Sequence, residues 1–391
     1  MLSQQKWPIY SHEEINAVTQ VLESGKVNYW TGEQGKLFER EYAEYLGLPF
    51  AITVANGTNA LELCLHALGI GPGDEVIVPL RTFMASASCV VEVGATPVMC
   101  EVDMVSQNLT VETVRPHVNA KTKAIIAVHL GGWPCEMEAL MAFAEAHHLY
   151  VIEDCAQAHG AFIDGKPVGS FGHLSAFSFC QDKMISTMGE GGLFATGNED
   201  WFKKAWAYKD HGKGYDTVYK KQHPPGFRWL HDGFGSNYRM TEAQAAVGRI
   251  QLRNLPEWTQ TRRAYAKIYD KALQGIAAVR LTLPPAEIEH GYYRYYCFVQ
   301  PHNLKEGWSR DRIIAEINAL GVWCQVGSCS EIYLEEAFVT SGLAPKDRFQ
   351  NAKELGENSL AFLIDPHYTA SSIHEAASAV AALLRSASRM E

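Results

Sequence analysis

Short apolar runs alternate along the first 200 residues with segments whose apolar positions recur every three or four residues. The runs are rich in Val and Ile and lack polar alternation, which predicts strands buried on both faces. We expect strands over residues 51–55, 75–79, 96–102, 122–129, 149–153, 176–179 and 192–196, with the last at an edge. The periodic segments predict helices over residues 59–68, 82–93 and 136–147. This alternation is typical of a parallel sheet with helices on both faces.

Two further helices are expected before the first strand. Ser11 is a good N-cap, and Glu14 follows three residues later in the pattern of a capping box. The helix that it begins should cover residues 11–24, and a second should cover residues 34–46. Both belong to an N-terminal helical segment of the same lobe.

The pattern changes at residue 210. Residues 210–235 are crowded with Gly, Pro, His and aromatic residues, and they predict a long irregular loop of the kind that is usually functional or an interface. A helix is expected over residues 241–255, and Pro256 should begin another long helix. A smaller α+β lobe then follows, with strands over 295–300 and 322–326 and helices over 309–320 and 371–386.

The expected fold is therefore α/β with two lobes. Residues 1–255 would form a large domain with a mostly parallel mixed sheet covered by helices on both faces. Residues 256–391 would form a small C-terminal α+β domain. A chain of 391 residues is long enough for two such lobes.

Composition narrows the choice of partners. The chain is 47% hydrophobic and 20% charged, which is ordinary for a globular protein. Its formal net charge of −10 does not favour binding to nucleic acid or to an anionic membrane. An anionic small molecule stays possible, because a helix N-terminus or a local basic side chain can hold one.

The nine cysteines are scattered and form no CxxC pair. This usage favours a reducing compartment, and we expect no metal site. The first eight residues lack the apolar segment of a secretory signal, and no apolar run approaches the roughly 18 residues of a membrane span. We therefore expect a cytoplasmic protein.

Asp154 stands at the end of the apolar run 149–153. Ligands of open α/β sheets bind at the carboxyl ends of strands, and a buried acid needs a partner. A protonated pyridine nitrogen is one such partner. The alternatives are a cap on the next turn or an ion pair with a basic residue of the core.

Lys183 follows Ser178 by five residues and precedes a glycine-rich stretch, Gly189 to Gly192. Most isolated lysines are solvated surface residues. Here a cationic or apolar setting would lower the pKa of the amine enough for attack on an aldehyde. A carboxylate, a hydroxyl and a lysine amine together are what an enzyme that uses pyridoxal 5′-phosphate (PLP) requires.

Three other segments fit the same interpretation. Gly57 and Thr58 lie between a strand and a helix, where free N–H groups bind anions, although a plain turn capped by Thr58 is the alternative. Phe83 is placed to stack on a flat ring, or to fill the core. Gln157 is placed to contact a phenolic oxygen, or is a surface amide.

Together these segments resemble the DegT/DnrJ/EryC1/StrS family, the sugar aminotransferases of PLP fold type I. The resemblance spans most of the first 255 residues. It rests on Ala55–Ala60, Gly71–Pro79, Thr82-Phe83, Ile152–Gly160, Val168–Gly172, Phe177–Phe179, Lys183, Gly189–Gly192, Asp210–Gly212 and Asn237–Glu242.

The resemblance implies a role for each candidate residue. Lys183 would hold PLP as a covalent Schiff base and move protons, and Asp154 would pair with the pyridine nitrogen. The remaining implied contacts are Gln157 with the phenolic oxygen, Phe83 with the ring, and Gly57, Thr58, Ser178 and, from the other subunit, Asn237 with the phosphate. A homodimer with shared active sites follows from the last of these.

The implied substrates are a nucleotide-linked keto sugar and L-glutamate. Amination at C4 of a 4-keto-6-deoxy hexose is the expectation, and amination at C3 is the alternative. A non-catalytic regulatory protein on the same fold is a further alternative, against which Lys183 and Asp154 both weigh. An oxidoreductase of the Rossmann type is not favoured, because no G-x-G-x-x-G follows the first strand.

Two segments depart from the family's pattern. Gly327-Ser-Cys-Ser-Glu-Ile-Tyr333 stands where many relatives have a His-Tyr pair near the sugar. Cys180-Gln-Asp182 replaces a more usual aromatic-proline stretch before the lysine, which we expect to alter packing rather than chemistry. Sugar 3-dehydratases of the family have histidine in place of the lysine, so the presence of Lys183 argues against that branch.

Overall fold

The computed structural model describes residues 7–223, 226 and 228–389. A seven-stranded sheet forms the centre of the large lobe, with the strand order β1-β9-β8-β5-β4-β2-β3. The strands are β1 (Phe50–Val54), β9 (Gly192–Thr196), β8 (Leu174–Ser178), β5 (Tyr150–Asp154), β4 (Thr122–Val128), β2 (Glu75–Pro79) and β3 (Thr96–Cys100). Only β9 runs antiparallel to its neighbours, so the carboxyl ends of the other six strands share one edge.

The expected mostly parallel mixed sheet is confirmed, but the edge position of β9 is wrong. β9 lies between β1 and β8, and all five of its residues are buried. Its apolar composition reflects this central place, since an edge strand tends to carry charges that discourage further pairing.

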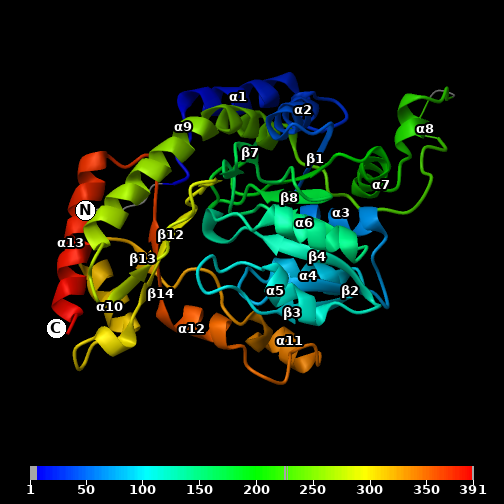
Figure 1. The fold of residues 1–391 in the computed structure, drawn as a ribbon. Coiled ribbons are helices and arrows are strands. Elements are labelled where there is room, and N and C mark those ends of the chain that lie inside the picture. Colours follow the sequence, from blue (N-terminus) through cyan, green and yellow to red (C-terminus); the bar gives the residue numbers. More distant parts are fainter. Residues whose placement is uncertain (1–6, 224–225, 227, 390–391) are drawn as a thin grey trace.

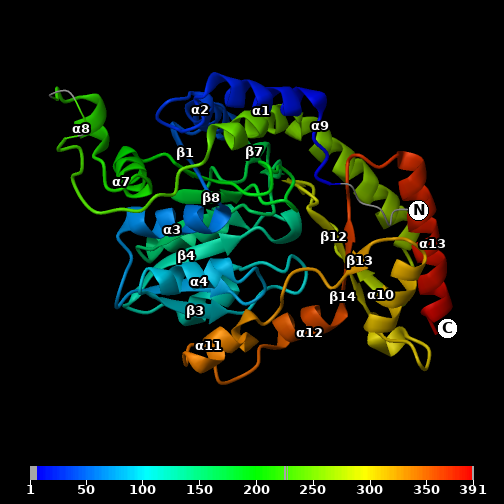
Figure 2. The ribbon, with the colours of Figure 1, turned by 180° about the vertical axis from the view of Figure 1, so that it is seen from behind.

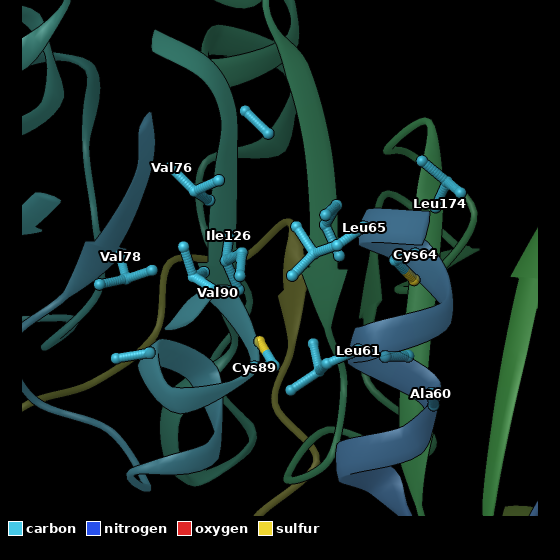
Figure 3. Close-up of a cluster of buried hydrophobic side chains, with 14 of the residues drawn as sticks. Ala60, Leu61, Cys64, Leu65, Val76, Val78, Cys89, Val90, Ile126 and Leu174 are labelled. Atoms are coloured by element: carbon cyan, nitrogen blue, oxygen red, sulfur yellow. The ribbon is translucent and has the colours of Figure 1, made fainter. Parts of the chain in front are cut away.

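Helices cover both faces of the sheet because successive strand residues point to opposite sides. Val76 and Val78 of β2 pack into one cluster with α3 (Gly57–Leu68), α4 (Ala85–Glu92) and α7 (Glu199–Lys209). Figure 3 shows how residues of α3 and α4 meet strand residues in this cluster. Ile77 lies in the opposite cluster with α5 (Val111–Val114) and α6 (Met137–Ala146).

The N-terminal segment adds two helices to the large lobe. α1 (His12–Ser24) begins with the capping box that the sequence predicts, in which Glu14 donates its N–H to the Ser11 hydroxyl and accepts from the Ser11 N–H. α2 (Gln34–Leu46) packs its apolar face on the sheet near β1, β8 and β9. Both helices have the predicted extents to within one residue.

A single helix, α9 (Glu242–Leu273), replaces the two helices expected on either side of Pro256. Figure 1 and Figure 2 show it running from above the large sheet to the small lobe. Leu252 and Leu255 pack against the large lobe, whereas Tyr265 and Tyr269 pack into the small lobe. These contacts on both sides keep the helix continuous through a residue that ordinarily breaks one. The division into domains 1–255 and 256–391 stays a prediction.

The small lobe is a four-stranded antiparallel sheet covered by α9, α10 (Arg310–Ala319) and α13 (Ala370–Ala387). Its strands, in spatial order, are β10 (Val279–Leu281), β12 (Arg294–Val299), β14 (Ser359–Leu363) and β13 (Cys324–Gln325). The sequence analysis missed β14, which directly follows α12 (Gln350–Asn358) without a turn signal. The chain also contains a short helix, α11 (Glu336–Thr340). A separate small sheet is formed by β6 (Phe162–Ile163), β7 (Lys166–Pro167) and β11 (Ile288–Glu289).

The segment 210–235 is less irregular than expected, because it contains the short helix α8 (Tyr215–Tyr219). Figure 1 and Figure 2 show α8 projecting from the large lobe. Residues 224–225 and 227 of the predicted loop lie outside the described residues, as do residues 1–6 of the N-terminal segment. Within the described chain, no helix combines the length and the apolar character needed to cross a membrane.

Candidate active site

A cavity of about 540 Å³ lies where the parallel strands end. Its walls come from the residues that close or follow β1, β2, β4, β5 and β8, because those strands all deliver their carboxyl ends to this edge. Seven of the eight candidate residues line it: Gly57, Thr58, Phe83, Asp154, Gln157, Ser178 and Lys183. Segments from residue 57 to residue 183 therefore meet in one space.

Asp154 lines this cavity and is 6% exposed. One carboxylate oxygen accepts a hydrogen bond from the Ser86 hydroxyl at 2.9 Å, and the other accepts from the Ala156 N–H at 3.1 Å. Burial raises the pKa of Asp154, and these hydrogen bonds and the charge of Lys183 only partly oppose that effect. No basic side chain of the described residues forms an ion pair with it, so the carboxylate still needs a cationic partner.

Thr82 and Ser86 orient that carboxylate, and the sequence analysis missed Ser86. Since the Ser86 hydroxyl gives its hydrogen to Asp154, Thr82 must donate to Ser86 across their 2.8 Å contact. Both residues are buried and line the cavity. A serine in the first turn of a helix that follows a strand end was the only signal, and many helices share it.

The amino end of α3 forms a second wall. Asn56 caps the helix by accepting from the Asn59 N–H, so the helix begins at Gly57 and not at residue 59, and Thr58 is not its cap. The N–H groups of a first helical turn have no acceptor within the helix, and they attract anions. A side chain at Gly57 would place its Cβ 2.7 Å from that of Ser178, which explains why glycine brings the helix so near β8.

Lys183 enters the cavity from the loop after β8. Its Nζ lies 3.6 Å from a carboxylate oxygen of Asp182 and 4.9 Å from the centre of the Tyr293 ring. Burial disfavours the charged amine, but the neighbouring phenol and carboxylate outweigh burial, and the pKa of Lys183 is raised. The expected lowering of this pKa is therefore wrong for the protein alone. Asp182 also brings a negative charge to the amine, so the Cys180–Asp182 stretch affects more than packing.

Phe83 and Gln157 both line the cavity but differ in how far they are exposed to solvent. Phe83 is 68% exposed and lines the cavity, so it does not fill the core. Gln157 is buried rather than at the surface. Its amide oxygen accepts from the Gly131 N–H at 2.7 Å, and its amide nitrogen lies 3.4 Å from the Ser328 hydroxyl.

The Gln157 contact places the atypical segment that begins at Gly327 beside the cavity. Ser328 donates its N–H to the Tyr296 hydroxyl, and Arg81 donates to Ser330 at 2.7 Å. Arg81 is buried and also donates to Ser359 of β14. These bonds fasten the small lobe to the strand ends of the large one.

Asn237 is the one candidate that does not line the cavity. It is exposed and forms an isolated backbone bridge with Asp210. A role at the cavity of its own chain is therefore not supported by this geometry.

Comparison with known proteins gives a consistent result over the whole chain. The sequence model of the DegT/DnrJ/EryC1/StrS aminotransferase family matches residues 8–381. A solved aminotransferase from Psychrobacter cryohalolentis shares 49% identity and superposes with a TM-score of 0.96, covering 98% of this chain and 99% of that one.

Two curated relatives differ from each other in their substrates. GDP-perosamine synthase from Vibrio cholerae is 39% identical over 69% of this chain and 70% of its own length. UDP-N-acetyl-3-dehydro-alpha-D-glucosamine 3-aminotransferase from Acidithiobacillus ferrooxidans is 38% identical over 72% of this chain and 73% of its own length.

Proposed function

Since this chain belongs to the DegT/DnrJ/EryC1/StrS aminotransferase family and is an aminotransferase of nucleotide sugars, we propose that it transfers an amino group from L-glutamate to C4 of a 4-keto-6-deoxy hexose. The observation that supports the chemistry best is the meeting of Lys183 with the buried Asp154 in one cavity at the strand ends. The product would be a nucleotide-linked amino sugar for surface polysaccharide or for a glycosylated metabolite.

The residues of the cavity fit PLP as the cofactor. Asp154 is buried without an ion-pair partner among the described residues, which suits a protonated ring nitrogen. The amino end of α3 and the Ser178 hydroxyl offer donors to a phosphate, and Gly57 leaves the room that this requires. Phe83 would cover the ring, and Gln157 would face its phenolic oxygen.

Bound PLP would supply an aldehyde that accepts the amino group and a cationic ring that withdraws electrons. Lys183 would hold the cofactor covalently through Nζ. Once released, the same Nζ would remove the proton from the α-carbon of glutamate, and in the second half it would return a proton to the sugar carbon. One amine thereby serves both halves of a ping-pong reaction.

We further propose that the active protein is a homodimer in which Asn237 of one chain reaches the phosphate of the other. Asn237 is exposed and lies outside the cavity of its own chain. Trp229 and Phe234, which precede it, are also exposed apolar side chains of the kind that a second copy would cover. The nine free cysteines suit our expectation of a cytoplasmic location.

Amination at C3 is the second candidate. The relative from Acidithiobacillus ferrooxidans is named a 3-aminotransferase and is nearly as similar to this chain as the GDP-perosamine synthase. A regulatory role without catalysis receives less support, because both the lysine and the acid line the cavity.

The test begins with protein loaded with PLP and given L-glutamate. We expect the visible absorbance band of the cofactor to disappear and one equivalent of 2-oxoglutarate to form. Lys183→Ala protein is the control, and we expect it to bind PLP without a covalent bond and to form no 2-oxoglutarate. Turnover near the wild-type rate in that variant would remove the proposed mechanism.

A panel of nucleotide-linked 3-keto and 4-keto sugars then tests which sugar carbon receives the amino group. Product amines are located by mass spectrometry and NMR. An amine at C4 supports the proposal, and an amine at C3 alone would replace it with the second candidate.

A further inference from the structure

We propose that Asp182, held in place by Tyr293, is a positioning residue that stabilises the ammonium form which Lys183 takes once the amine, free of cofactor, has accepted a proton. The inference rests on the proposed function, in which Lys183 alternates between a free and a bound amine. It assigns a chemical role to the residue at which this chain departs from the aromatic-proline pattern.

Two side chains, Asp182 and Tyr293, lie beside the Lys183 amine, and we call this pair the clamp. The Asp182 carboxylate oxygen that lies 3.6 Å from Lys183 Nζ also accepts the hydrogen bond of the Tyr293 hydroxyl. The face of the Tyr293 ring lies 4.9 Å from the same Nζ. The amine thus has a negative oxygen on one side and an electron-rich ring on another, and both attract an ammonium.

The clamp joins the two lobes. Asp182 belongs to the loop after β8, whereas Tyr293 directly precedes β12 of the small lobe. The guanidinium of Arg294 lies 4.1 Å from the centre of the Tyr293 ring and donates to the Tyr293 hydroxyl at 3.4 Å. The same guanidinium lies 5.0 Å from the centre of the Trp323 ring, so Arg294 contacts two aromatic rings of the small lobe.

Several other titratable groups act on Lys183 from the surrounding elements. Cys180 shares its loop, Asp154 ends β5, and His159 and Arg294 approach from other segments. Among the described residues, Asp182 is the carboxylate that forms an ion pair with Lys183 Nζ. Burial raises the pKa of Asp182, but Lys183, Tyr293 and Arg294 together lower it by more than burial raises it. The net pKa is therefore lowered, and this carboxyl group is ionised near neutral pH.

This arrangement has a chemical consequence for a lysine that must act first as a base and then as an acid. A carboxylate beside the free amine stabilises the ammonium, which is the form that returns a proton. The Lys183 side chain is only 15% exposed, so solvent and salt screen the charge of its amine only in part. Asp182 itself touches neither reacting carbon, and it acts through Lys183.

The experiment measures the acidity of Lys183 directly in protein free of cofactor. Wild-type and Asp182→Asn proteins are labelled with trace acetic anhydride from pH 6 to pH 11, and acetylation of Lys183 is read by mass spectrometry against an exposed lysine. Because Asp182→Asn removes the negative charge, we expect more free amine and at least threefold faster labelling at pH 8. Asp182→Glu should restore most of the wild-type profile, which a merely structural role would not predict.

Two further variants guard the interpretation. Tyr293→Phe removes the hydroxyl that holds Asp182 and should shift the labelling profile in the same direction by a smaller amount. Asp311→Asn removes one negative charge from an exposed site and should leave the profile of Lys183 unchanged. A melting curve for each variant shows that the compared proteins are folded.

Labelling of Lys183 that is the same within experimental error in Asp182→Asn and wild-type protein would overturn the inference. Failure of the proposed function is seen separately, as wild-type protein that forms no 2-oxoglutarate from L-glutamate. The two failures are distinguishable because the labelling requires neither cofactor nor substrate.

Discussion

His159 shows how one buried side chain fixes the end of a strand at the cavity. The carbonyl of Ser178 can only accept, so His159 Nε2 donates to it at 2.9 Å, and Nδ1 accepts from the Tyr42 hydroxyl at 2.8 Å. Burial lowers the pKa of His159 to about 4. The neutral ring therefore holds Ser178 in position at physiological pH.

This residue predicts an acid limit of stability. The unfolded chain binds a proton at His159 near the ordinary pKa of 6.5, whereas the folded chain binds one only near pH 4, so its stabilising contribution is present above pH 6.5 and lost as pH falls towards 4. Between pH 7 and pH 5 we expect this group to remove about 2 kcal/mol from the free energy of unfolding. Urea titrations of wild-type and His159→Gln proteins at both pH values measure it. Equal losses in the two proteins would show that another group is responsible.

At the scale of elements, the approach of α3 to β8 determines the shape of the cavity. A Cβ added at Gly57 would lie only 2.7 Å from the Cβ of Ser178. A Cβ added at Gly192 of β9 would lie only 2.3 Å from the carbonyl oxygen of Asn56. Glycines at both points let the amino end of the helix lie directly over the strand ends.

We predict that Gly57→Ala weakens PLP binding by about tenfold, because overpacking of roughly 1–3 kcal/mol would push α3 away from Ser178. Equilibrium titration of the cofactor by absorbance measures the change. Gly71→Ala is the matched control, since the nearest atom to its new Cβ lies at an ordinary 3.6 Å. Equal affinity in both variants would mean that the helix end does not bind the phosphate.

The continuity of α9 shows that tertiary packing can override a local sequence rule. A proline inside a helix removes one backbone hydrogen bond and usually ends the helix, and that local rule suggested a boundary at Pro256. The packing of Leu252 and Leu255 on one side and of Tyr265 and Tyr269 on the other overrides it.

At the scale of the whole molecule, the two lobes meet over the cavity. Tyr293 and Ser328 come from the small lobe, and each contacts a cavity residue of the large lobe. Arg81 ties the lobes together with two hydrogen bonds, to Ser330 and Ser359, and donates a third to Gln107 of its own lobe. A movement between the lobes would therefore change the surroundings of Lys183.

The proposed shared site predicts complementation between two impaired variants. Lys183→Ala should be inactive, and Asn237→Ala should retain its cofactor poorly. A hybrid dimer carries one cavity with both natural residues if Asn237 acts across the interface, so mixing should restore up to about a quarter of wild-type activity at random exchange. Activity is measured after co-refolding of the two variants. No recovery from demonstrated hybrids would show that Asn237 does not act across the interface.

The sequence by itself determined the α/β class, the extents of α1 and α2 and the parallel strands, because hydrophobic periodicity and capping are local properties. It also predicted that Asp154, Ser178 and Lys183 belong to one site, since strand ends carry ligand contacts in this kind of sheet, and the three residues line one cavity. Only the tertiary structure decided the central place of β9, the continuity of α9, and the neighbours of Lys183. Asp182 and Tyr293 are 111 residues apart, and no local pattern relates two side chains that meet only when separate lobes pack together.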